Sequence, residues 1–132
     1  MQKVARPDTE VSIQGVDEYA SKMNDSDYIQ FMHMPQVIDK VLQAEKEGYD
    51  ALCTGGALDL AHVYYRELLD IPVAFIWESS LNNACQLARQ FGIVGLNEGV
   101  LGRQMSLVKY HGLEQRWIAW RLTCMQLTAR IC

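Results

Sequence analysis

Apolar and polar positions follow two different periods along this chain, and the changes of period mark the expected elements. Apolar residues recur three to four positions apart from Pro35 onward, which predicts a helix that ends at Gly48. A continuous apolar run over Tyr49–Thr54 then predicts a strand buried on both faces. Gly55 and Gly56 predict the turn into the next helix.

The same order of strand, turn and helix repeats through the rest of the chain. We expect, in order, a helix over 57–69, a strand over 71–77, a helix over 81–91 that Gly92 ends, a strand over 93–96, and a helix over 99–110 that Gly112 ends. This alternation predicts an α/β fold with right-handed crossovers. Its centre would be a parallel sheet of three or four strands with flanking helices.

The two ends of the chain follow these periods less well. Thr9–Ile13 alternates apolar and polar residues and predicts a short strand, whereas residues 16–31 are polar and predict a loop. The tail from Arg116 is apolar enough for either a strand or a helix. Trp117 and Trp120 in that tail predict an apolar surface through which the chain could form a homo-oligomer.

Composition and charge narrow the class of protein. The 132 residues suffice for one ordinary domain, and 49% hydrophobic with 21% charged residues is typical of a globular protein. The net charge of −4 supplies no basic surface, so we expect no nucleic-acid partner. An apolar leader and a membrane-length apolar run are both missing from the sequence, which predicts a cytoplasmic protein without a membrane partner.

The four cysteines show no spacing that is typical of a metal site. Cys53, Cys85, Cys124 and Cys132 form no CxxC pair and no metal-type pattern with the three histidines. We therefore expect free thiols and no metal. Because Cys53 lies within a predicted buried strand, we expect its side chain in the core.

Candidate binding residues follow three predicted strands at their carboxyl ends, where ligands of parallel sheets bind. They are Thr54, Gly55 and Gly56 after the first of these strands, Glu78 and Ser79 after the second, and Asn97 after the third. The free N–H groups of the glycine turn could hold a carboxylate or a phosphate. Ser79 or Ser80 is also expected to cap the helix that follows.

Three segments carry a family likeness. AEKEGYDALCTGG, YYRELLDIPVAFIWESS and ACQLARQFGIVG, in this order and spacing, resemble the aspartate/glutamate/hydantoin racemase family over roughly residues 43–116. The resemblance implies a Rossmann-like first half over 1–90, without the family's first strand, and the start of a second half over 91–132. It also implies cofactor-independent proton transfer at the α-carbon of a small amino acid, hydantoin or related carboxylate or carbonyl compound, between two cysteines.

The sequence departs from the family at both catalytic positions. By the family spacing the first cysteine would stand at Gly56, and the Gly-Cys pair of the second is missing. Cys53, three residues before Gly56, is then the candidate catalytic thiol, and weak or no activity is expected. A gene fragment, a truncated or frameshifted reading frame and a diverged product would all fit these departures from the family.

Three functions therefore stay open at the level of the sequence. The first is a racemase that uses Cys53 or a second subunit. The second is a decarboxylase that resembles the arylmalonate decarboxylases, which carry glycine at the position of Gly56. The third is a non-catalytic fragment or assembly module.

Overall fold

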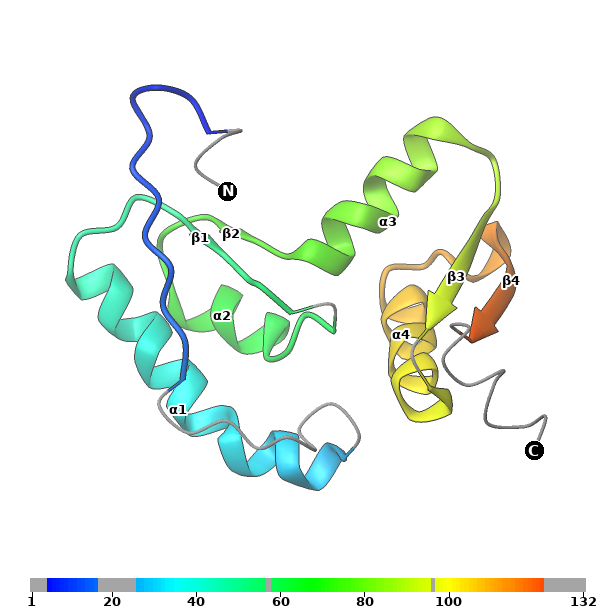
Figure 1. Ribbon diagram of the computed structural model, residues 1–132, viewed down its shortest axis with the longest axis horizontal. Helices are drawn as coiled ribbons and strands as arrows, with labels where there is room; N and C mark the ends of the chain where they lie inside the picture. The colour runs from blue at the N-terminus through cyan, green and yellow to red at the C-terminus, as the bar shows by residue number, and fades with distance from the viewer. Residues whose placement is uncertain (1–4, 17–25, 57, 96, 123–132) are drawn as a thin grey trace, which may run out of the picture.

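Helices and strands alternate along the chain in the computed structural model, which describes residues 5–16, 26–56, 58–95 and 97–122 (Figure 1). In chain order they are α1 (Asp27–Lys46), β1 (Leu52–Cys53), α2 (His62–Leu68), β2 (Val73–Ala74), α3 (Ile76–Leu87), β3 (Phe91–Gly95), α4 (Glu98–Tyr110) and β4 (Trp117–Leu122). A 3₁₀ turn over Glu114–Arg116 precedes β4. Within this part of the chain, every helix is too short or too polar to cross a bilayer.

The strands form two separate parallel pairs. β1 pairs with β2, and β3 pairs with β4 with a shift of register after Phe91. The α/β class is confirmed, but the expected single sheet of three or four strands is wrong for the described residues. α3 (Ile76–Leu87) separates β2 from β3 along the chain, and β3 pairs with β4 and not with β2.

α1 begins at Asp27, well before the expected start near Pro35, which lies inside the helix. Ser26 is the reason: its hydroxyl oxygen accepts the N–H of Ile29 at 3.3 Å and caps the first turn. The expected loop over 16–31 is therefore wrong from Asp27 onward, and residues 17–25 lie outside the described part. The predicted end is confirmed, since Gly48 has a φ of +86°.

Two predicted elements are shorter or missing. The helix expected over 57–69 is reduced to α2, because Asp59 and Ala61 have φ values of 42° and 61° that no helix accommodates. The prediction of a strand over Thr9–Ile13 is wrong. Residues 10–16 form no backbone hydrogen bond with another described residue.

α3 ends at Leu87, earlier than predicted, so Gly92 lies inside β3 and does not end a helix. A residue of the apolar tail binds the last carbonyl groups of α3 and so stabilises its end at Leu87. Arg116 donates from Nη2 to the carbonyl oxygens of Cys85 and Ala88 at 2.8 and 2.6 Å. The tail itself continues as the strand β4 through residue 122, and the remaining tail residues lie outside the described part.

Two core clusters lie under these elements. The first consists of Val41, Ala61, Tyr65, Leu69 and Phe75. The second consists of Leu81, Ile93, Leu101 and Val108. An ion pair of 2.7 Å between Asp27 of α1 and Arg103 of α4 joins the helix beside the first cluster to the helix of the second.

Candidate functional site

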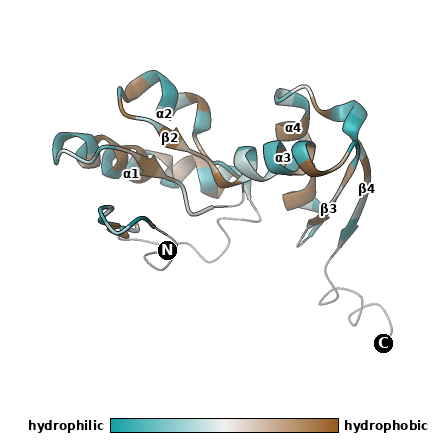
Figure 2. Ribbon diagram, turned by 90° about the horizontal axis from the view of Figure 1, so that it is seen from above, coloured by the Kyte–Doolittle hydropathy of each residue, from teal (hydrophilic) through white to brown (hydrophobic). Residues whose placement is uncertain are grey.

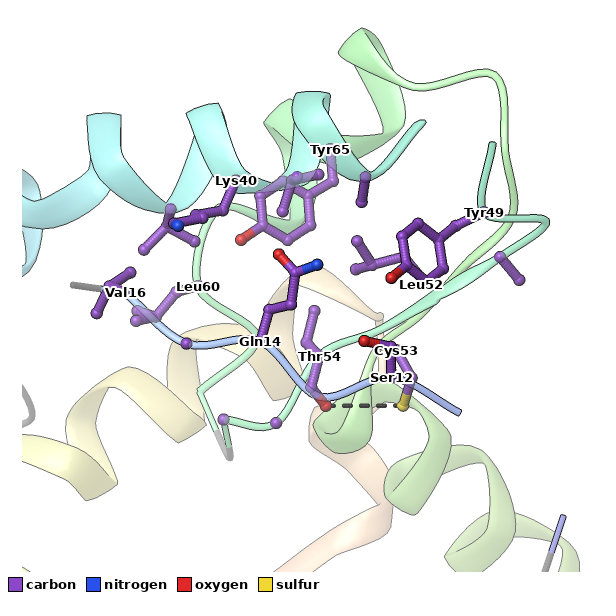
Figure 3. A pocket seen from close by; sticks show the side chains of 17 residues that line it. Ser12, Gln14, Val16, Lys40, Tyr49, Leu52, Cys53, Thr54, Leu60 and Tyr65 are labelled. Atoms are coloured by element: carbon purple, nitrogen blue, oxygen red, sulfur yellow. Dashed lines mark hydrogen bonds between the residues drawn. The ribbon is translucent and has the colours of Figure 1, made fainter. Parts of the chain in front are cut away.

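A cavity of about 290 Å³ opens beside the carboxyl end of β1 (Figure 3). Its walls come from residues 12–16, from α1, from the run 51–56 and from α2. Val37, Val41 and Ala44 give the α1 wall its apolar character. The prediction of a site at this strand end therefore coincides with a cavity.

Cys53 lines this cavity and its side chain is exposed. The expectation that Cys53 packs in the core is wrong. Adjacent residues of a strand point to opposite faces, and Leu52 is the residue that packs against the first core cluster. The Cys53 thiol donates a long hydrogen bond to the carbonyl oxygen of Thr54 at 3.7 Å.

The predicted loop residues Thr54, Gly55 and Gly56 line the same cavity. The hydroxyl oxygen of Thr54 is buried and has no hydrogen-bond partner among the described residues. A Cβ atom built at Gly55 or Gly56 would meet no atom within 4 Å beyond the chain neighbours. The loop therefore presents one unsatisfied polar group beside open space.

Tyr65 contributes a second polar group from α2. Burial raises the pKa of the Tyr65 hydroxyl from 10.0 to about 12, so this group stays protonated at neutral pH. Its ring stacks on Phe75 with the centroids 5.8 Å apart, which fixes its direction. In Figure 3 the Tyr65 hydroxyl, the Lys40 side chain and the Gln14 amide lie around the same space.

The other predicted residues lie away from this cavity. Glu78 pairs with Arg66 across the start of α3, and Ser79 is an exposed residue inside α3. Asn97 caps α4 by accepting the N–H of Val100 at 2.8 Å. A role of Glu78, Ser79 and Asn97 in substrate binding stays a prediction.

The cap of α3 is a residue that the sequence analysis missed. The carboxylate of Asp59 accepts the N–H groups of Trp77 and Glu78 at 2.9 and 2.7 Å. The prediction that Ser79 or Ser80 caps this helix is wrong, because the helix has already begun at Ile76. A capping residue is expected just before its helix, and Asp59 stands too far upstream for such a local signal.

His33, His62 and His111 do not line the cavity. His62 packs at the first turn of α2, with its ring centroid 4.7 Å from that of Tyr110, as expected for a packing residue. His33 lies within α1, where its Nδ1 is 2.9 Å from the carbonyl oxygen of Ile29. Among the residues that the structure describes, no group of three or more histidine, cysteine, aspartate or glutamate side chains could hold a metal ion.

The fold and the cavity at the end of β1 define the chain as an α/β protein, a class whose members carry out many different functions. No protein-family model matches the chain. Over 101 residues it is 32% identical to a hydantoin racemase of Pseudomonas sp. (strain NS671), a match that covers 76% of this chain and 41% of that protein.

Two solved structures share the fold. An allantoin racemase from Klebsiella pneumoniae matches with a TM-score of 0.76 over 92% of this chain and 49% of its own. One from Pseudomonas fluorescens matches with a TM-score of 0.77 over 97% of this chain and 55% of its own. Both are 22% identical in sequence to this chain.

The chain belongs to the Asp/Glu/hydantoin racemase family, as the resemblance in its sequence predicted. It spans about half the length of the relatives that it matches.

Proposed function

We propose that this chain forms part of a racemase-type site for a small carboxylate or carbonyl compound such as a hydantoin. We further propose that the chain transfers protons weakly or not at all. The observation that supports this is the glycine at position 56. The family likeness expects a catalytic cysteine there, and Gly56 lines the cavity without a side chain.

Proton transfer at an α-carbon explains why this position matters. One group must remove the proton while a second group on the opposite face returns one, and each must lie within hydrogen-bond reach. Among the lining residues, Cys53 is the one that carries a thiol. A single thiol supplies one side of such an exchange, so we expect slow exchange at most.

Binding of such a ligand does not need the two catalytic thiols that the family likeness implies. The Thr54 hydroxyl has no partner among the described residues, and the Tyr65 hydroxyl is a neutral donor. Hydroxyl groups of this kind can hydrogen-bond the oxygen of a carboxylate or a ring carbonyl. The apolar wall of α1 would accept the hydrocarbon part of the ligand.

The test is deuterium exchange at the α-carbon of a 5-substituted hydantoin, followed by proton NMR in heavy water. We expect the chain to accelerate exchange weakly or not at all, and Cys53→Ala to abolish any acceleration. Binding is followed separately by the NMR line width of the hydantoin. Exchange that is fast and survives Cys53→Ala would contradict the proposal, as would the lack of any hydantoin binding.

A decarboxylase-like activity is the second candidate, favoured by the open space at Gly56. A substrate with two carboxylates on one carbon needs more room than an α-proton does, and a Cβ at Gly56 has no neighbour within 4 Å. Release of carbon dioxide from phenylmalonate would reveal this activity. Release that continues after Cys53 is replaced by alanine would exclude Cys53 as the proton donor.

A further inference from the structure

The Tyr65 side chain is buried, but its hydroxyl group faces the cavity beside β1. Tyr65 is 3% exposed and belongs to the first core cluster, which joins the neighbouring helices α1 and α2 (Figures 1 and 2). Its ring stacks on Phe75, yet its hydroxyl makes no hydrogen bond to another described residue. Because a buried phenol usually finds a hydrogen-bond partner, this hydroxyl indicates a partner on a bound ligand.

The Cys53 thiol reaches the same cavity from another element. Both residues line the cavity, and in Figure 3 the thiol from β1 and the Tyr65 hydroxyl from α2 lie on opposite sides of it. Inversion at an α-carbon needs such an arrangement, because one group removes a proton from one face and another group delivers a proton to the opposite face. The placement of Cys53 and Tyr65 meets this requirement.

Two other lining side chains carry protons that can be transferred, and neither is placed as well. Tyr49 leads into β1, and Figure 3 shows it on the side of the cavity where Cys53 lies. Lys40 ends a flexible aliphatic stem, whereas stacking on Phe75 fixes the direction of the Tyr65 hydroxyl. The geometry therefore favours Tyr65 as the group opposite the thiol.

We propose that Tyr65 is the second proton-transfer residue of this site, opposite Cys53. The proposal rests on the proposed function, and a phenol takes the place of the second thiol that the family likeness implies. The thiolate of Cys53 takes the α-proton, and the electron pair of the broken C–H bond moves into the neighbouring carbonyl group to give an enolate. The enolate carbon then takes the proton of the Tyr65 hydroxyl on its opposite face, which leaves a phenolate. Water carries the proton from the Cys53 thiol to this phenolate and so restores the first state.

Burial of the phenol gives a physical reason for slow turnover. It raises the pKa of Tyr65 to about 12, so the phenolate forms at a high cost near neutral pH. General acid–base catalysis is most efficient when the pKa of the catalytic group lies near the working pH. A thiol paired with this phenol therefore gives weak proton transfer, as the proposed function expects.

An enantiopure 5-benzylhydantoin in heavy water separates the two proton transfers in the full chain. Proton NMR measures deuterium exchange at the α-carbon and circular dichroism measures inversion, each corrected for the rate without protein. In Tyr65→Phe, Cys53 can still remove the α-proton and return deuterium to the same face. We expect inversion to fall about 100-fold, or to the rate without protein, while exchange of the enantiomer whose α-proton faces Cys53 persists. Cys53→Ala should stop both processes for this enantiomer.

Tyr64→Phe is the matched control, because Tyr64 is 51% exposed and does not line the cavity. We expect this variant to keep the ratio of exchange to inversion of the unmodified chain. A second variant carries 3-fluorotyrosine at position 65 alone, which keeps the shape of the ring and makes its hydroxyl more acidic. We expect faster inversion at neutral pH and unchanged exchange at the Cys53 face, an effect that a packing role of the ring would not produce.

The proposal is overturned if folded Tyr65→Phe keeps the inversion rate of the unmodified chain, or if exchange and inversion fall by the same factor. If Tyr65→Phe fails to fold, as circular dichroism would reveal, the fluorinated chain decides, and an unchanged inversion rate there overturns the proposal. Binding of the hydantoin without any inversion overturns this proposal alone. A chain that binds no hydantoin overturns the proposed function as well.

Discussion

The carboxylate of Asp59 accepts the backbone N–H of Glu78 at 2.7 Å and so ties the loop after β1 to the first turn of α3. Its other oxygen accepts the N–H of Trp77 at 2.9 Å. Asp59 is 2% exposed, and the positive end of the helix dipole lies at these N–H groups. The same residue therefore starts α3 and fixes one end of the cavity loop.

Replacing Asp59 by alanine removes both acceptors and leaves two helix N–H groups without them. We expect the free energy of unfolding to fall by about 2 to 3 kcal/mol. Asp59→Asn should cost less, because its amide oxygen still accepts one hydrogen bond. Urea unfolding followed by circular dichroism measures both changes.

The matched control is Asp50→Ala, since Asp50 is exposed. Its effect should stay within about 0.5 kcal/mol. Equal effects of the alanine substitutions at Asp59 and Asp50 would show that the α3 cap contributes nothing to stability.

Glycine positions in the fold differ in what a side chain would meet. A Cβ at Gly56 has no neighbour within 4 Å, whereas a Cβ at Gly95 would lie 3.3 Å from Oε1 of Gln104 and 3.6 Å from Cβ of Leu101. We expect Gly56→Ala to change stability by less than about 1 kcal/mol. Gly95→Ala should cost about 1 to 3 kcal/mol by overpacking.

Gly56→Cys uses the same open space to place a thiol at the family position. We expect a folded protein in which Ellman's reagent titrates one thiol more than in the parent Cys53→Ala variant, because Cys85, Cys124 and Cys132 are present in both. A destabilised or unreactive variant would show that the loop closes over position 56.

The sequence predicted those features of the fold that arise from local periodicity. The α/β order, the parallel pairing and the end of α1 at Gly48 follow from runs of apolar residues and from one glycine. The start of α1 did not, because Ser26 caps it inside a polar stretch with little periodicity. Cys53 was misplaced for a different reason: an apolar run predicts burial on both faces, and in β1 one face borders a cavity.

The candidate site was predicted in part. Thr54, Gly55 and Gly56 come together at the cavity because they are adjacent in sequence at one strand end. Tyr65 and Asp59 could not be placed in this way. Each acts on groups from another element, and such contacts follow from packing and not from a local pattern.

Burial of the Tyr65 hydroxyl predicts a specific loss of stability at high pH. Its pKa is about 12 in the folded protein and near 10.0 in the unfolded chain. Folding thus favours the neutral form of Tyr65, and the contribution of this group to the free energy of unfolding is fully present below pH 10. That contribution is lost as the pH rises toward 12, by about 2 to 3 kcal/mol in total.

Tyr65→Phe removes this titrating group, and we expect the variant to lose less stability than the unmodified chain between pH 10 and pH 12. Tyr64→Phe is the matched control, because Tyr64 is 51% exposed. Urea unfolding at a series of pH values gives the comparison. Identical slopes for the two variants would contradict the assignment of the pH dependence to Tyr65.

Arg116 joins the segment before β4 to the end of α3, and its removal tests whether that contact stabilises the second core cluster. Its Nε donates to the carbonyl oxygen of Arg89 at 3.1 Å, and its Nη2 donates to those of Cys85 and Ala88. Arg116→Ala should lower the free energy of unfolding by about 1.5 to 3 kcal/mol, as expected for hydrogen bonds from a charged group. Arg116→Lys should recover only part of this loss, because an ammonium group lacks the planar fork that reaches several carbonyls at once.

Arg121→Ala, at an exposed position of β4, is the control for loss of one positive charge. A full recovery by lysine would show that charge alone, and not the geometry of the guanidinium, stabilises the end of α3.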